Sequence, residues 1–203
     1  MTGTTAESLL ERVSTFVAGL VEGRDPDLGA HHQRLREGTM LFAQYVGYSP
    51  EEAQLLSVGA RLHDIGKLSI SEHILNKPAR LTAAEVNLVQ RHALIGSQFV
   101  EPLGLDPRIN EIVLYHHENY DGSGYPVGLV GEAIPVMARI VRIWDSFDAL
   151  TITRPYQRAV SPAQALHQLQ QRSQLYDPYL LKSFCELMSK HRMPKTGRQH
   201  RDA

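Results

Sequence analysis

Apolar residues recur every three or four positions along most of the chain, which is the spacing of an amphipathic helix. Two such stripes lie near the N-terminus: Leu9, Val13, Phe16 and Leu20, then Leu35, Phe42 and Val46. A third helix is predicted from Ile134-Pro135 to about residue 151, with an apolar face formed by Ile140, Ile143 and Phe147. The pattern indicates a chain built mainly from helices.

Capping residues followed by proline mark further helix starts. Ser49-Pro50-Glu51-Glu52 combines an N-cap, a proline at the first helical position and a capping-box glutamate. Thr82 and Glu85 form a second capping box, and Asp106, Ser161 and Asp177 each precede a proline. These starts predict helices over about 50–64, 83–100, 107–118, 162–173 and 178–191.

Two segments lack helix signals and are expected to be loops. Residues 66–81 contain Gly66 and Pro78, and residues 119–134 are rich in glycine. The chain is therefore predicted to be all-α, a single-domain helical bundle with the glycine-rich loop at the rim of its site. We expect an N-terminal helix over 1–21, the bundle over 22–190, and a basic, disordered tail over 191–203.

Composition narrows the class of protein. The chain has 203 residues, 42% of them hydrophobic, and a formal net charge of −1, so neither a nucleic-acid nor a membrane surface is indicated. Cys185 is the only cysteine, which excludes an intrachain disulfide and fits a reducing compartment. No signal peptide is recognised at Met1–Ser8, and we expect a cytoplasmic protein without DNA, RNA or membrane partners.

Histidine and aspartate recur in successive predicted helices. His63-Asp64-Ile65-Gly66-Lys67 is followed by His92, by His116-His117 and by Asp145. Such spacing suggests side chains that converge on one multinuclear metal site in the bundle core. Neighbours on a helix point about 100° apart, so His116 and His117 are predicted to serve different metals. Asp64 could bridge two ions, as in two-metal sites that clamp a phosphoryl displacement.

With these motifs the sequence resembles the HD-GYP subgroup of the HD phosphohydrolase superfamily, whose members hydrolyse the bacterial messenger cyclic di-GMP. The likeness covers about residues 22–180. Besides the residues above, it rests on Arg24-Asp25-Pro26 leading to His31, Lys77-Pro78, Glu118, the run from Asp121 through Gly122-Ser123-Gly124-Tyr125 to Pro126, Asp148, and Arg154-Pro155-Tyr156.

The resemblance implies a role for each matching residue. The implied metal ligands are His31, His63, Asp64, His92, His116, His117 and Asp145. Asp64 and Lys67 would be catalytic, with Asp64 bridging the ions and Lys67 placing its ammonium on a phosphate oxygen. The implied substrate contacts are Lys67, Gly124, Tyr125, Asp148 and Arg154. The histidines that match no motif position are expected at the surface: His32, His73, His167, His191 and His200.

Asp27 lies four residues before His31 and would share its helix face. Similar proteins carry a carboxylate there that holds a third metal, which would help the enzyme to act on the linear product as well. The alternative is an aspartate favoured at a helix start by the macrodipole. Both interpretations stay open at this point.

The resemblance also implies cofactors and partners. Two or three divalent metal ions are expected, with iron or manganese first and nickel or zinc as alternatives, because the ligands are histidine and carboxylate without thiolate. The expected substrate is cyclic di-GMP, and the GYP loop implies contacts with a diguanylate cyclase.

The sequence departs from the HD-GYP pattern at two positions, and two other functions compete with that of a cyclic di-GMP phosphodiesterase. Gln157 stands where many relatives have a basic residue near the substrate phosphate, and Ala79 replaces a common glycine. A low-turnover cyclic dinucleotide receptor or interaction module is one alternative. The other is an HD hydrolase of another nucleotide, such as cyclic GMP-AMP or a guanosine alarmone, although Gly124-Tyr125-Pro126 favours cyclic dinucleotides over alarmones.

Overall fold

The structure is a computed structural model that describes residues 3–23, 26–153 and 158–190. Its α-helices are α1 (Gly3–Glu22), α2 (Pro26–Tyr45), α3 (Pro50–Leu62), α4 (Glu72–Leu75), α5 (Ala83–Gln90), α6 (His92–Val100), α7 (Pro107–Tyr115), α8 (Val136–Thr151), α9 (Pro162–Gln171) and α10 (Pro178–Lys190). Short 3-10 helices are η1 (Ile65–Ser69), η2 (Glu101–Leu103), η3 (Gly131–Ala133) and η4 (Ser173–Leu175). No strand occurs within these ranges, so the predicted all-α fold is confirmed.

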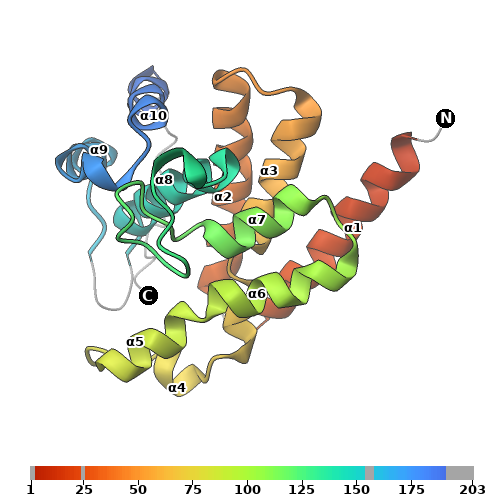
Figure 1. The fold of residues 1–203 in the computed structure, drawn as a ribbon, viewed down its shortest axis with the longest axis horizontal. Coiled ribbons are helices and arrows are strands. Elements are labelled where there is room, and N and C mark those ends of the chain that lie inside the picture. The colour runs from red at the N-terminus through yellow and green to blue at the C-terminus, as the bar shows by residue number, and fades with distance from the viewer. Residues whose placement is uncertain (1–2, 24–25, 154–157, 191–203) are drawn as a thin grey trace, which may run out of the picture.

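The larger hydrophobic core surrounds α8, which packs on α2 and carries α9 and α10 on its other sides (Figure 1). Aromatic rings form its centre. Phe184 of α10 meets Phe42, Trp144 and Phe147 edge to face, with ring centroids 5.1–5.4 Å apart. Edge-to-face contacts of this kind add to the energy of simple burial. They therefore stabilise the packing of α10 against α8 and α2.

A smaller core joins α1, α3 and α7. Val21 of α1 is buried against Val58 and Leu62 of α3 and Ile109 and Val113 of α7. The N-terminal helix therefore shares a core with the bundle. Our boundary at residue 21 and the disordered tail stay predictions, and residues 191–203 lie outside the described part of the chain.

Three helix predictions need correction. The helix expected over 83–100 is divided at Arg91 into α5 and α6, so His92 opens a helix of its own. The loop expected over 66–81 contains η1 and α4. The helix expected to reach residue 118 ends at Tyr115, because His116 forms the C-cap. Two of these differences, the break at Arg91 and the end of α7, lie beside predicted metal ligands. In the described residues, no helix combines the length and apolarity that a bilayer crossing requires.

Candidate metal centre

The predicted ligands come from five places in the fold. His31 lies in α2, His63 caps the C-terminus of α3, and Asp64 begins η1. His92 begins α6, while His116 and His117 follow the end of α7, and Asp145 lies in α8. Most of these side chains therefore lie at helix ends, where the chain changes direction and the side chains can point toward a common centre.

The junction between η1 and α6 is unusually close. A Cβ atom added to Gly66 would lie 2.0 Å from the carbonyl oxygen of His92. Only glycine fits at this contact, and the resulting approach brings Asp64 within reach of the His92 ring: Asp64 Oδ1 lies 3.3 Å from His92 Nε2.

The ligands form two groups that share Asp64. One group contains His31, His63 and Asp64, and we call it the His31 half. The other contains Asp64, His92, His116 and His117, and we call it the His92 half. Within each group the candidate donor atoms lie within 4.8 Å of one another. This sharing fits the predicted bridging carboxylate. His116 and His117 both lie in the second group, and their assignment to different metals stays a prediction.

Three histidine rings are oriented by the backbone. The Nδ1 atoms of His63, His92 and His116 lie 2.7–2.9 Å from the carbonyl oxygens of Ala60, Val89 and Val113, each three residues earlier. A carbonyl oxygen only accepts hydrogen bonds, so each Nδ1 carries the hydrogen. In the neutral ring, Nε2 is then an unprotonated acceptor, and all three Nε2 atoms are ready to bind a cation.

These acceptors face one another. His92 Nε2 lies 3.2 Å from His116 Nε2, and His63 Nε2 lies 3.2 Å from Asp64 Oδ2. Asp64 Oδ1 is buried and accepts no hydrogen bond in the described structure. Buried acceptors without a donor between them are costly. Histidine ligands about 2.1 Å from one metal ion are about 3 Å apart, so a divalent cation fits this arrangement.

Charge around Asp64 shifts the pKa values of its neighbours. Burial raises the pKa of Asp64, but His63 and Lys67 outweigh burial and hold this pKa well below its usual range. Burial lowers the pKa of His63, but the Asp64 carboxylate outweighs burial and raises it. In the His92 half, burial lowers the pKa of His92, of His116, and of His117, the last to about 3. Asp64 is therefore ionised, and the three histidines of the His92 half are neutral. These are the protonation states in which carboxylates and histidines bind metal.

Lys67 stands at the edge of this site. Its ammonium lies 2.6 Å from Asp64 Oδ2, and 23% of its side chain is exposed. The side chain thus reaches from the buried carboxylate to solvent, where a molecule that enters the site could contact its ammonium.

Asp145 and Asp148 lie one helical turn apart on α8 and differ in role. Asp145 Oδ1 is 3.5 Å from His31 Nε2, and nearby histidines, His31 first, outweigh burial and lower its pKa to about 2. Asp148 is buried, and its two oxygens are engaged by His31 Nδ1 at 2.7 Å and by Arg34 Nε at 2.6 Å. The substrate contact predicted for Asp148 does not fit this place, because the carboxylate lies behind His31. Arg34 was missed, although its spacing of three residues from His31 was a usable signal.

The middle of the glycine-rich loop is held against His117, Glu118 and Asn119, the residues that precede it or begin it. Tyr125 stacks on His117, with ring centroids 4.7 Å apart and planes inclined by 28°. The predicted substrate residue Gly124 lies so close to the chain that an added Cβ would be 2.2 Å from the backbone nitrogen of Asn119. Glu118 is buried, and its carboxylate accepts hydrogen bonds from the backbone nitrogens of Val127, Gly128 and Leu129. Glu118 is thus the anchor of the loop, a role that the sequence did not reveal.

Other predicted residues are placed as follows. His73 and His167 are exposed as expected, but His32 is buried, with its ring centroid 5.6 Å from that of His63. The surface prediction for His32 is wrong because α2 turns two consecutive positions toward α3. Asp27 belongs to α2, but its side chain lies outside the described part, as do Arg154 and Gln157.

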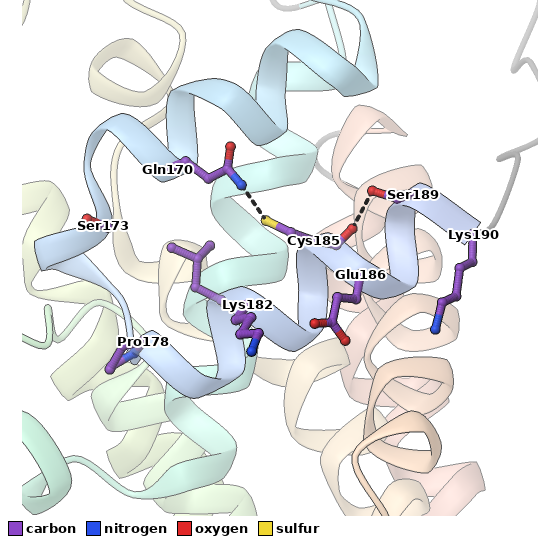
Figure 2. A pocket seen from close by; sticks show the side chains of 9 residues that line it. Gln170, Ser173, Pro178, Lys182, Cys185, Glu186, Ser189 and Lys190 are labelled. Carbon is purple, nitrogen blue, oxygen red and sulfur yellow. Dashed lines mark hydrogen bonds between the residues drawn. The ribbon is translucent and has the colours of Figure 1, made fainter.

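A hollow of about 610 Å³ lies elsewhere, between α9 and α10 (Figure 2). Gln170 donates a hydrogen bond there to the Cys185 sulfur, and Lys182 and Lys190 stand at its border. None of its lining residues belongs to the predicted metal set. The candidate metal centre is therefore identified by its histidine and aspartate side chains, and this hollow is a separate feature of the surface.

Residues 15–180 match the family model of the HD domain. The chain belongs to the HD domain family. The response regulator RpfG of Xanthomonas campestris, named a cyclic di-GMP phosphodiesterase, is 44% identical over 167 residues, which cover 80% of this chain and 44% of RpfG. The 3′3′-cGAMP-specific phosphodiesterase 3 of Vibrio cholerae is 37% identical over 160 residues, which cover 79% of this chain and 35% of that protein.

A solved structure has the same HD domain fold. Bd1817, an HDG"Y"P protein from Bdellovibrio bacteriovorus, superposes with a TM-score of 0.65 at 20% identity, covering 92% of this chain and 63% of that one. The resemblance to HD-GYP proteins is thereby confirmed. This HD domain chain spans less than half the length of the two curated relatives.

Proposed function

We propose that this HD domain is a metal-dependent phosphodiesterase that hydrolyses cyclic di-GMP to linear pGpG, GMP or both. The observation that carries the proposal is the convergence of buried acceptors around Asp64, with His92 Nε2 and His116 Nε2 3.2 Å apart and no donor between them. A second support is the 44% identity to a relative named for this reaction.

Two divalent ions bound here would supply an activated water and take up charge from the phosphoryl oxygens. The protein's own residues set the geometry. Asp64 offers one oxygen to each half, and the backbone carbonyls fix the histidine rings. Lys67 places its ammonium at the exposed edge, where it would neutralise a phosphate oxygen. Tyr125, which stacks on His117, would limit where a nucleotide base of the substrate can lie.

The finer assignments follow from the ligand types. Iron or manganese would suit the histidine and carboxylate set, with nickel or zinc as alternatives. If a third ion binds, Asp27, four residues before His31 in the sequence, would be its ligand. Arg154 would bind a second phosphate, the cytoplasm would be the site of action, and a diguanylate cyclase would meet the GYP loop.

The experiment is a chromatographic time course of cyclic di-GMP with protein loaded anaerobically with manganese or iron, run beside Asp64→Ala. Conversion by the wild type and its loss in Asp64→Ala would support the proposal. Absence of conversion by metal-loaded wild type would overturn it in favour of a receptor. Accumulation of pGpG would indicate a dinuclear site, whereas GMP would favour a third ion, and Asp27→Ala should then stop the reaction at pGpG.

Cyclic GMP-AMP is the second candidate substrate. The Vibrio cholerae relative named for it is 37% identical. The same time course with cyclic GMP-AMP compares the two substrates directly, and a higher kcat/KM for cyclic GMP-AMP would replace cyclic di-GMP in the proposal.

A further inference from the structure

The histidines of the metal centre are oriented by two different means, and His31 differs in this respect from His63, His92 and His116. In the His92 half, His92 and His116 are fixed by backbone carbonyls that no side-chain substitution removes. In the His31 half, His31 is fixed by a side chain, because its Nδ1 lies 2.7 Å from Asp148 Oδ2. The orientation of His31 therefore depends on residues that can be changed without touching a ligand.

Arg34 completes this support. Its Nε lies 2.6 Å from Asp148 Oδ1 and a terminal guanidinium nitrogen lies 2.9 Å from Asp148 Oδ2. This two-point contact fixes the plane of the carboxylate. An ionised carboxylate only accepts hydrogen bonds, so His31 Nδ1 must carry the hydrogen. His31 Nε2 is then the acceptor that faces Asp145, 3.5 Å away.

We propose that Arg34 and Asp148 are positioning residues that hold His31 in its metal-binding tautomer, so that breaking this pair removes the metal of the His31 half and leaves that of the His92 half. The inference rests on the metal centre of the proposed function and adds which residues control each part of it. Groups that orient a ligating histidine typically contribute about 10- to 100-fold in metal affinity.

Asp148→Asn is the informative substitution because it keeps the shape and removes the charge. The amide has one acceptor oxygen, whereas the carboxylate serves both His31 and Arg34. If the amide nitrogen faces His31, it donates to Nδ1 and moves the ring hydrogen to Nε2. If it faces Arg34 Nε, the amide oxygen still accepts from His31 Nδ1, but two donors meet at Arg34 and the two-point contact that fixes the plane of the group is lost. Either arrangement weakens the His31 half.

The fold offers a matched control on the same helix. Arg139 of α8 pairs with Asp177, a buried carboxylate that also caps the start of α10 by accepting from the backbone nitrogens of Tyr179 and Leu180. The side chains of Asp148 and Asp177 are 6% and 9% exposed. Asp177→Asn therefore disturbs an equally buried ion pair but contacts no predicted metal ligand.

The experiment measures bound manganese per chain by mass spectrometry in the whole protein, with folding checked by circular dichroism. We expect two ions in the wild type and in Asp177→Asn, and one tightly bound ion in Asp148→Asn, with the second weakened by about 10- to 100-fold. Long-range proton–nitrogen NMR of the metal-free protein should show His31 with hydrogen on Nδ1 in the wild type and a changed ring signal in Asp148→Asn, a shift that loss of stability alone does not cause.

The results distinguish a failure of the positioning role of Arg34 and Asp148 from a failure of the metal centre itself. Two ions of unchanged affinity in Asp148→Asn overturn the positioning role but leave the proposed function standing. A wild type that binds no manganese, iron or zinc overturns the metal centre itself. If Asp148→Asn does not fold, Arg34→Lys serves instead, since it keeps the charge and loses the planar two-point contact. Unchanged affinity for the second ion in that variant also overturns the proposal.

Discussion

The two halves of the metal centre share Asp64 but are built differently. The His92 half is drawn from chain ends that the backbone itself fixes: the start of α6 and the turn after α7. The His31 half joins α2 to α8 through a buried ion pair, with Asp148 between His31 and Arg34. His92 and His116 are thus oriented by local backbone carbonyls, whereas His31 is oriented by a distant side chain, and changes to each half should have separable effects.

The largest effect is expected from Asp64→Ala, because this carboxylate belongs to both halves. Both ions should be lost and the rate of cyclic di-GMP hydrolysis should fall by about 10³-fold or more, since removing even one group that stabilises developing charge costs about 10²–10³-fold. Metal analysis and the time course measure the two losses together. Retention of either ion at wild-type affinity would break the claim that Asp64 is shared.

Lys67→Ala should separate catalysis from metal binding. The Lys67 ammonium contacts Asp64 but belongs to neither ligand group. We expect kcat to fall by about 10²-fold through loss of charge at the phosphate, with two ions still bound. The exposed Lys182 is the control, and Lys182→Ala should keep wild-type kcat. A Lys67→Ala variant with wild-type kcat would contradict the catalytic role.

Glu118→Ala should affect the rim next to the His92 half. The buried carboxylate accepts hydrogen bonds from three successive backbone nitrogens of the loop, and the alanine variant loses all three of these charge-assisted bonds. We expect the free energy of unfolding to fall by about 2–3 kcal/mol, with a higher KM as Tyr125 loses its fixed position. Denaturant unfolding and steady-state kinetics measure both. The exposed Glu132 lies on the same loop, and Glu132→Ala should change neither quantity.

A smaller effect is expected from pH. The Asp64 carboxylate outweighs burial and raises the pKa of His63, whereas burial lowers the pKa values of His92 and His116. As pH falls, His63 therefore takes up a proton before His92 and His116 do, and this proton competes with metal in the His31 half. Calorimetric titration of metal-free protein from about pH 8 to about pH 5 should show one of two binding steps weakening first. Simultaneous loss of both steps would contradict the comparison.

The sequence predicted more of the centre than of its support. Capping boxes at Ser49 and Thr82 located two helix starts, and both boxes are present in the structure. The seven ligands implied by the motifs converge as predicted, because each motif fixes a short stretch of backbone. By contrast, the pairing of Arg34 with Asp148 joins residues 114 positions apart, and the spacing of Arg34 from His31 does not identify Asp148 as its partner.

Helix ends were the other source of error. The capping residues predicted a continuous helix through His92 and another through His117, but the structure ends a helix beside each histidine. The close contact between Gly66 and the His92 carbonyl lies one residue beyond the first break. Tertiary contacts at functional sites override local propensity in this way.

The most direct test of the account is an anomalous difference map from crystals of the protein soaked with manganese. The account predicts two peaks about 3.5–4 Å apart, one on each side of Asp64, with one near His31 and His63 and the other near His92 and His116. A single peak, or two peaks that do not share Asp64, would contradict a dinuclear centre bridged by this carboxylate.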